Sequence, residues 1–154
     1  MTLAAGSPAP DFTLMADDGK PLTLSGLKGR PVVLYFYPKD DTPGCTREAC
    51  AFQENKAKFA KAKAQVIGVS RDSTERHARF KQKYGLEFPL VSDPEAQLCK
   101  SYGVWKEKVL YGKKSLGIER STFLIDAKGV VRKVWRKVKV EGHEAEILAA
   151  LNDL

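Results

Sequence analysis

An uninterrupted apolar run from Pro31 to Tyr37, rich in Val, Tyr and Phe, restricts the fold more than any other feature. Such a run indicates a buried β-strand. A short polar loop follows it, and the segment Thr46 to Phe59 then predicts a helix, because it contains good helix formers and no internal Gly or Pro. The centre of the chain therefore predicts a buried strand that leads through one loop into a helix.

The rest of the chain continues this alternation of strands and helices. Strands followed by helices, with a terminal hairpin and a last helix, indicate an α/β fold with a mixed sheet. The length of 154 residues suits a single domain that covers 1–154. The expected elements are a β-hairpin of Asp11 to Leu14 and Leu22 to Leu24, a strand Gln65 to Ser70, a helix from the N-cap Ser73 to Tyr84, a strand Phe88 to Ser92, a helix from Asp93 through Tyr102, a loop Lys106 to Gly117, strands Arg120 to Asp126 and Val130 to Val138, and a helix Glu144 to Leu151.

The net charge of +7 raises the question of a nucleic-acid partner. The basic residues are spread along the chain, and the densest cluster is Arg132 to Lys139. Charged residues on a solvent-facing strand also protect the edge of a sheet against aggregation, which explains this cluster without a nucleic acid. No RNA-binding signature accompanies it, so we expect no nucleic-acid partner. The apolar runs are too short to span a bilayer and the first residues lack a secretory pattern, so we expect no membrane partner and a cytoplasmic protein.

Cys45 lies where the loop after the buried strand meets the start of the next helix. Free backbone N–H groups and the helix dipole both favour an anion at that position. A thiol placed there is expected to exist largely as thiolate, which is the reactive form of cysteine. Position alone therefore makes Cys45 a candidate nucleophile.

The chain has three cysteines, an odd number that does not suggest a disulfide framework. Cys45 and Cys50 also lack the short ligand spacing of a zinc site, and His77 and His143 are far from them in sequence, so no metal is expected. Cys99 lies beside Leu98 in a predicted helix and is expected to fill the core.

The pattern Pro38-x-x-x-Thr42-x-x-Cys45 resembles the active-site signature of the peroxiredoxins. The second cysteine, Cys50, is similar to that of the bacterioferritin-comigratory or Q-type branch, and Arg120 before a late hydrophobic strand completes the pattern. The resemblance covers essentially the whole chain. It implies a thioredoxin fold with a central mixed sheet, flanked by helices and preceded by an N-terminal β-hairpin.

The resemblance also implies a thiol-dependent peroxidase that needs no cofactor. Cys45 would attack hydrogen peroxide or an organic hydroperoxide, while Thr42 and Arg120 hold the peroxide and Pro38 limits access of water. Cys50 would then resolve the oxidised Cys45 as a disulfide. Thioredoxin or a glutaredoxin-like dithiol donor would reduce that disulfide, and the protein would be a monomer.

Two other functions compete with this interpretation. A thioredoxin-like disulfide reductase or redox carrier would favour Cys-x-x-Cys, whereas this chain has four residues between Cys45 and Cys50. A basic binding or chaperone-like protein with incidental thiols would bind polynucleotides in a salt-sensitive way, unaffected by Cys45→Ser.

Overall fold

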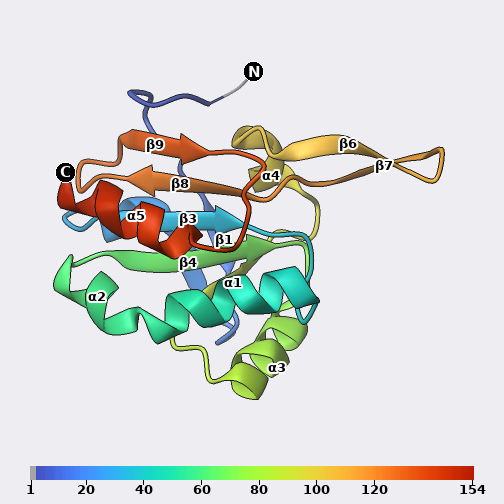
Figure 1. Cartoon of the computed structure of the whole chain (residues 1–154), viewed down its shortest axis with the longest axis horizontal. Coiled ribbons are helices and arrows are strands. Elements are labelled where there is room, and N and C mark those ends of the chain that lie inside the picture. Colours follow the sequence, from blue (N-terminus) through green and yellow to red (C-terminus); the bar gives the residue numbers. More distant parts are fainter. Residues whose placement is uncertain (1–2) are drawn as a thin grey trace.

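The structure is a computed structural model that describes residues 3–154. Its centre is a five-stranded mixed sheet (Figure 1). The strand order is β5 (Leu90–Ser92), β4 (Gln65–Ser70), β3 (Val32–Phe36), β8 (Ser121–Ile125) and β9 (Val131–Trp135). Strand β3 runs parallel to β4 and antiparallel to β8, and β4 runs parallel to β5. The strands predicted from apolar runs are therefore confirmed, with shorter bounds at several ends.

Strand β3 lies in the middle of this sheet, and all of its residues are buried. Its side chains alternate between two cores, as the two-residue period of a strand requires. Leu34 and Phe36 face one core, while Val33 and Tyr35 face the other. A strand that is covered on both faces explains why its sequence reads as a continuous apolar run.

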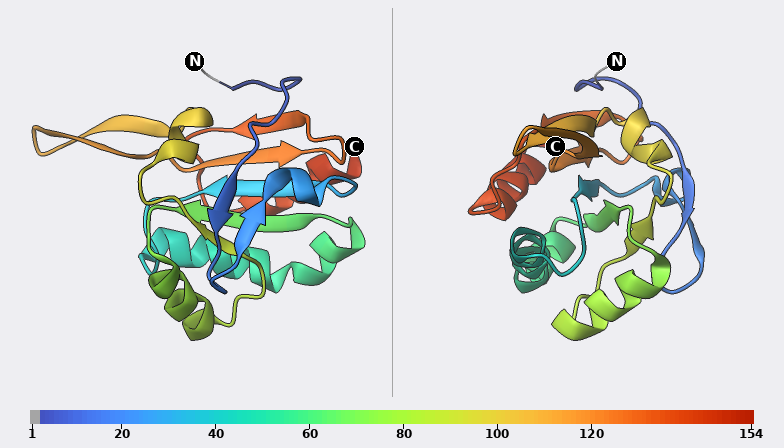
Figure 2. Two further views of the ribbon diagram at one scale, coloured as in Figure 1. Left: turned by 180° about the vertical axis from the view of Figure 1, so that it is seen from behind. Right: turned by 90° about the vertical axis from the view of Figure 1, so that its right-hand side faces the viewer.

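Helices cover one face of the sheet, and the N-terminal segment covers much of the other (Figure 2). The core of Tyr35 is completed by side chains from the first three α-helices and the last. The core of Phe36 is completed by α4 and the 3₁₀ helix η1. The helices are α1 (Pro43–Glu54), α2 (Lys56–Lys61), α3 (Thr74–Tyr84), α4 (Gln97–Ser101), α5 (His143–Asn152) and η1 (Leu24–Leu27).

The predicted N-terminal hairpin is confirmed as β1 (Thr13–Met15) paired with β2 (Pro21–Thr23). The predicted helix at Ser73 is confirmed as well, because the Ser73 side chain accepts a hydrogen bond from the backbone N–H of Arg76. These elements depend on contacts between residues close in sequence, which local patterns describe well.

The helix expected from Thr46 to Phe59 differs in two ways. It begins earlier, at Pro43, where the missing N–H of proline costs no hydrogen bond. It is also divided at Asn55, whose side-chain amide donates to the carbonyl of Ala51 at 2.8 Å. Asparagine competes for backbone groups in this way, so α1 ends at Glu54 and α2 starts at Lys56.

The loop predicted from Lys106 to Gly117 is wrong. This segment forms a hairpin of β6 (Trp105–Leu110) and β7 (Lys113–Ile118), which projects from the body of the molecule (Figure 1). Its two-residue turn, Tyr111 and Gly112, has positive φ angles of 52° and 76°, as tight hairpins require. Because most of β7 is exposed on both faces, the sequence shows no apolar alternation that would reveal a strand.

The helix predicted to start at Asp93 begins only at Gln97, because Ala96 has a φ of 58° and interrupts the helical conformation. Asp93 instead accepts hydrogen bonds from the backbone N–H groups of Leu98 and Cys99, and thus stabilises the first turn from a distance. Over residues 3–154 the structure contains no helix long and apolar enough to cross a membrane.

Candidate active site

Cys45 lies in the first turn of α1, next to the end of β3 from which the loop 38–42 departs. Only 2 % of the residue is exposed. The Thr42 side chain makes no capping hydrogen bond to the helix, and its hydroxyl donates to the carbonyl of Lys39 at 2.8 Å. The first N–H groups of α1 are consequently left to bind an anion near the sulfur.

Arg120 brings a permanent positive charge to the sulfur. It directly precedes β8, and Ser121 pairs with Phe36 at the end of β3, so the sheet register places Arg120 beside the start of α1. The Arg120 Nη2 atom lies 3.3 Å from the Cys45 Sγ atom. The sequence-predicted pair of Cys45 and Arg120 is thus in contact, although the two residues are far apart in the chain.

Gly44 makes room for this contact. A Cβ atom at Gly44 would lie 3.1 Å from Nη2 of Arg120, which is closer than nearly all real contacts of this kind. A larger residue would push the guanidinium away from the sulfur. The absence of a side chain at Gly44 therefore allows Arg120 to lie close to the first turn of α1.

Glu48 is a site residue that the sequence analysis missed. It lies one helical turn after Cys45, is 2 % exposed, and its Oε1 atom accepts from Nη1 of Arg120 at 2.6 Å. Burial raises the pKa of Glu48 to about 7, although the guanidinium acts in the opposite direction. Burial also disfavours the charged form of Arg120, but Glu48 and the Cys45 sulfur outweigh this effect and raise the Arg120 pKa. Glu48 and Cys45 thus hold the guanidinium from two sides.

The raised pKa of Glu48 predicts a pH-dependent stability. The folded protein binds the Glu48 proton more tightly than the unfolded chain, so the free energy of unfolding falls as pH rises from about 4.5 to about 7. Glu48→Gln stays neutral at every pH and lacks this loss. Relative to wild type, the variant should gain up to about 3 kcal/mol between pH 4.5 and pH 8, because one pKa unit corresponds to about 1.4 kcal/mol. Urea unfolding at both pH values measures this difference.

Glu54→Gln, at an exposed position on the same helix, is the matched control for that measurement. Its free energy of unfolding should follow the wild-type pH profile. Parallel profiles of Glu48→Gln and wild type would show that the Glu48 proton is not bound more tightly in the folded state.

Cys50 is also on α1 but is only partly buried, unlike Cys45 and Glu48. Both thiols are free. Burial, and then the nearby Glu54 carboxylate, raise the Cys50 pKa. Cys50 is therefore less prone to exist as the reactive thiolate than an unperturbed cysteine is.

Cys99 is fully buried, as predicted, and belongs to the core of Phe36. Cys45 belongs to the core of Tyr35, so the two thiols lie on opposite faces of the sheet. Burial, together with the Asp93 carboxylate, raises the Cys99 pKa strongly. The sheet therefore lies between Cys99 and Cys45.

Pro38 and Thr42 lie on the loop that joins β3 to α1. Pro38 is exposed and lines a hollow of about 350 Å³, together with residues of the projecting hairpin such as Trp105 and Lys108. Thr42 is half-buried, and the proton of its hydroxyl is already donated to Lys39. Its oxygen can still accept a hydrogen bond.

A thioredoxin-like sheet that presents one nearly buried cysteine at a helix start, in contact with an arginine, defines a thiol-based redox protein. The sequence model of the AhpC/TSA family matches residues 5–134 of the chain. The chain belongs to this family, the peroxiredoxins, and is a thiol-dependent peroxidase.

Individual relatives agree with this assignment. The chain is 52% identical to peroxiredoxin Bcp of Bacillus subtilis over 154 residues, which cover 100% of this chain and 98% of the relative. It is 53% identical to a putative peroxiredoxin bcp of Coxiella burnetii, over 98% of this chain and 100% of the relative. The solved structure of a Xylella fastidiosa PrxQ mutant matches with a TM-score of 0.93 and 42% identity, over 99% of this chain and 97% of the other. The predicted peroxiredoxin identity and thioredoxin fold are confirmed.

Proposed function

We propose that Cys45 is the peroxidatic thiol of this peroxidase. The observation that carries the proposal is the 3.3 Å contact between Sγ of Cys45 and Nη2 of Arg120 at the start of α1. Arginine cannot be deprotonated in a protein, so its positive charge lies beside the sulfur at every physiological pH. The same charge can stabilise the oxygen that leaves when the peroxide bond breaks.

In the proposed reaction the Cys45 thiolate attacks one peroxide oxygen, and the O–O bond breaks. Cys45 becomes a sulfenic acid, while the other oxygen leaves as hydroxide or alkoxide and takes up a proton to give water or an alcohol. The open N–H groups of α1, the Thr42 oxygen and the Arg120 guanidinium hold the peroxide in line with the sulfur. Pro38, at the loop's exposed edge, limits the access of water.

Cys50 is the proposed resolving thiol. Its sulfur attacks the sulfenic sulfur of Cys45, which releases water and forms a disulfide. Its place on the same helix, on the same side of the sheet as Cys45, supports Cys50 over the fully buried Cys99. Thioredoxin or a glutaredoxin-like dithiol donor then reduces the disulfide.

The proposed substrates are hydrogen peroxide and organic hydroperoxides. Among the similar solved structures, one from Xanthomonas campestris, 48% identical with a TM-score of 0.91, is described in terms of the alkyl peroxide reduction activity of that bacterioferritin comigratory protein. A similar site here supports the same class of substrate. The assay is consumption of hydrogen peroxide and tert-butyl hydroperoxide by the reduced protein with a dithiol donor, and no consumption of either peroxide would refute the proposal.

Replacing Cys50 with serine should leave the first oxidation intact and stop the second. The sulfenic acid of Cys45 should then accumulate, and it can be trapped with dimedone and measured by mass spectrometry. Cys99→Ser is the matched control, and it should still form the disulfide. Unchanged thioredoxin-dependent turnover of Cys50→Ser would assign resolution to another thiol.

We also propose that residues 1–154 act as one domain, as a monomer in the cytoplasm, without a nucleic-acid or membrane partner. The two cores share one sheet, and the matched region spans most of the chain, which supports a single unit. The dispersed basic residues support a solvated surface rather than a nucleic-acid site.

A further inference from the structure

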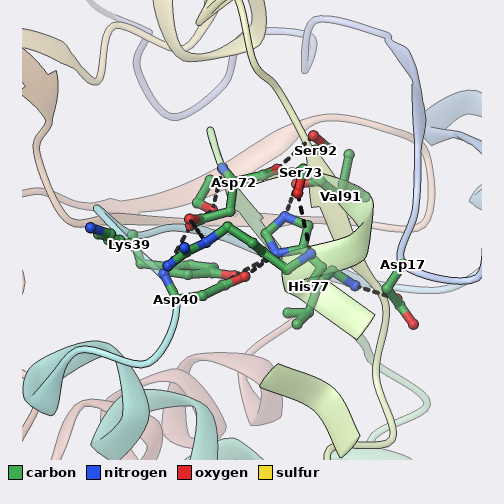
Figure 3. Close-up of polar contacts among 12 residues, drawn as sticks. Asp17, Lys39, Asp40, Asp72, Ser73, His77, Val91 and Ser92 are labelled. Carbon is green, nitrogen blue, oxygen red and sulfur yellow. Dashed lines mark hydrogen bonds and ion pairs between the residues drawn. The ribbon is translucent and has the colours of Figure 1, made fainter. Parts of the chain in front are cut away.

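A buried polar cluster ties the loop before Cys45 to helix α3 (Figure 3). The Asp40 carboxylate comes from the loop 38–42 and is 2 % exposed, while His77 comes from α3 and is fully buried. Asp40 Oδ2 lies 2.6 Å from Nδ1 of His77, and Asp40 Oδ1 accepts from the Tyr37 hydroxyl at 2.5 Å. The peroxidase site described above uses none of these contacts.

The geometry fixes how many protons the cluster holds. Nε2 of His77 lies 3.0 Å from the carbonyl oxygen of Val91 on β5. A carbonyl oxygen only accepts, so Nε2 carries a proton. A further proton must lie between Nδ1 and Asp40 Oδ2, because two lone pairs would otherwise face each other at 2.6 Å. His77 therefore bonds to the loop through one nitrogen and to β5 through the other.

The same arrangement argues against a metal ion, although Asp40, Asp72 and His77 bring possible ligand atoms within 4.8 Å of one another. Both nitrogens of His77 already have partners, and Asp72 Oδ2 accepts from the Asp40 backbone N–H at 2.8 Å and from the Ser70 hydroxyl at 2.7 Å. A buried network whose polar groups all have hydrogen-bond partners fixes the position of the segment to which it is bonded. Here it binds the loop.

A second and weaker tie lies at the end of α3. The exposed Asp41 carboxylate accepts from Lys83 Nζ at 2.7 Å and from the Tyr84 hydroxyl at 2.6 Å. Exposed ion pairs contribute little to stability, whereas the removal of one partner from a buried, hydrogen-bonded pair has a large effect. The Asp40–His77 contact is accordingly the stronger anchor of the loop on α3.

We propose that His77 is a positioning residue for peroxide reduction, which holds the loop 38–42 through Asp40 so that Thr42 and Cys45 keep their places. His77 touches neither the peroxide nor the sulfur. Its effect passes along the backbone from Asp40 to Thr42, two residues on, and to the first turn of α1. Any movement of that turn away from Arg120 has to displace this anchored loop or strain it.

The anchor then acts on the two halves of the catalytic cycle in opposite directions. This part rests on the proposed Cys45–Cys50 disulfide, which requires the first turns of α1 to open. A held loop favours attack on peroxide, because the site stays assembled. A released loop favours opening and hence disulfide formation. His77 thereby sets the balance between the peroxide-reducing form and the disulfide-forming form.

Two substitutions of His77 separate its two hydrogen bonds. The amide nitrogen of Asn can take the place of Nδ1 and keep the bond to Asp40, whereas that of Gln can take the place of Nε2 and keep the bond to Val91. In a Cys50→Ser background, stopped-flow oxidation of Cys45 should be at least about tenfold slower with His77→Gln than with His77→Asn, because a small misplacement of reacting groups has large effects on rate.

The matched control is Val131→Ala. Val131 is buried and pairs with Ile125, at the end of β8 that lies away from Arg120 and the site. This substitution should lower the melting temperature and leave Cys45 oxidation at the wild-type rate. Two outcomes would show a merely structural role and overturn the proposal. One is that His77→Asn and His77→Gln slow Cys45 oxidation equally. The other is that the oxidation rate follows the melting temperature across all three variants. If His77→Gln does not fold, Tyr37→Phe removes one donor to Asp40 and should slow oxidation several-fold; a wild-type rate would again overturn it.

With Cys50 present, His77→Gln should form the disulfide faster than wild type once Cys45 is oxidised. It should also give less sulfinic acid at high peroxide, because the sulfenic acid is consumed sooner. A wild-type protein that forms no Cys45–Cys50 disulfide would refute the proposed resolving thiol. The rates in the Cys50→Ser background would still decide the role of His77.

Discussion

Cys45→Ser should lose peroxide reduction almost completely, by a factor on the order of 10⁴ or more, as with the loss of other catalytic nucleophiles. A serine hydroxyl in the same place stays protonated, and its oxygen is a poor nucleophile toward peroxide. Neither remaining thiol can take over. Burial raises the pKa of Cys50, and Cys99 lies across the sheet from the site of Cys45.

The measurement is peroxide consumption with saturating dithiol donor, for Cys45→Ser and for Cys99→Ser. Cys99→Ser should keep its turnover, because Cys99 belongs to the other core. Substantial turnover by Cys45→Ser would sink the assignment of the peroxidatic thiol. Loss of turnover in both variants, with both folded, would place Cys99 in the cycle.

Arg120→Met should slow the attack on peroxide by about 10² or more, by comparison with the loss of other preorganised donors. The substitution removes the guanidinium that contacts both the Cys45 sulfur and Glu48. The thiolate loses its counter-charge, and the leaving oxygen loses a donor. Glu48, buried and without its partner, should then bind a proton at neutral pH.

Arg120→Lys separates charge from geometry. Lysine keeps the positive charge but cannot reach Glu48 and Cys45 at once with a rigid fork. Its rate should therefore lie between those of wild type and Arg120→Met. Single-turnover oxidation at several pH values, together with alkylation of Cys45 by bromobimane, measures attack and thiolate content separately. A wild-type rate in Arg120→Met would refute the role of the guanidinium.

The sequence predicted those parts of the fold that local patterns determine. Strand β3 reads as buried because both of its faces are covered, and the Ser73 cap was readable because its bond spans only three residues. The projecting hairpin was missed because most of β7 is exposed on both faces and so produces no alternating pattern. The break at Asn55 was missed because asparagine is tolerated in many helices, and only its bond to Ala51 shows the competition.

The site was also predicted only in part, because local patterns indicate contacts between residues that are close in sequence. Cys45 could be recognised from its place between a strand and a helix. Glu48 follows it by three residues, so helical spacing could have placed it on the same face, but a carboxylate there also suits an exposed surface. The partnership of Asp40 with His77 joins positions 37 residues apart, and no local pattern indicates such a contact.

We propose that helix α1 supplies both reacting thiols, Cys45 and Cys50, and that its first turns open to join them. Five residues along an ideal helix advance about 7.5 Å, and the two Cα atoms of Cys45 and Cys50 are then about 8.7 Å apart. A disulfide needs Cα atoms within roughly 7 Å, so a rotamer change alone cannot form it. The first turns of α1 should therefore unwind when Cys45 and Cys50 are oxidised.

Amide hydrogen exchange on the reduced and the oxidised protein measures this unwinding, with the Cys45–Cys50 disulfide verified by mass spectrometry. Protection of residues 46–52 should fall on oxidation, while β3 at Val32–Phe36 stays protected. Equal protection of α1 in both states, with the disulfide present, would show that the helix does not unwind.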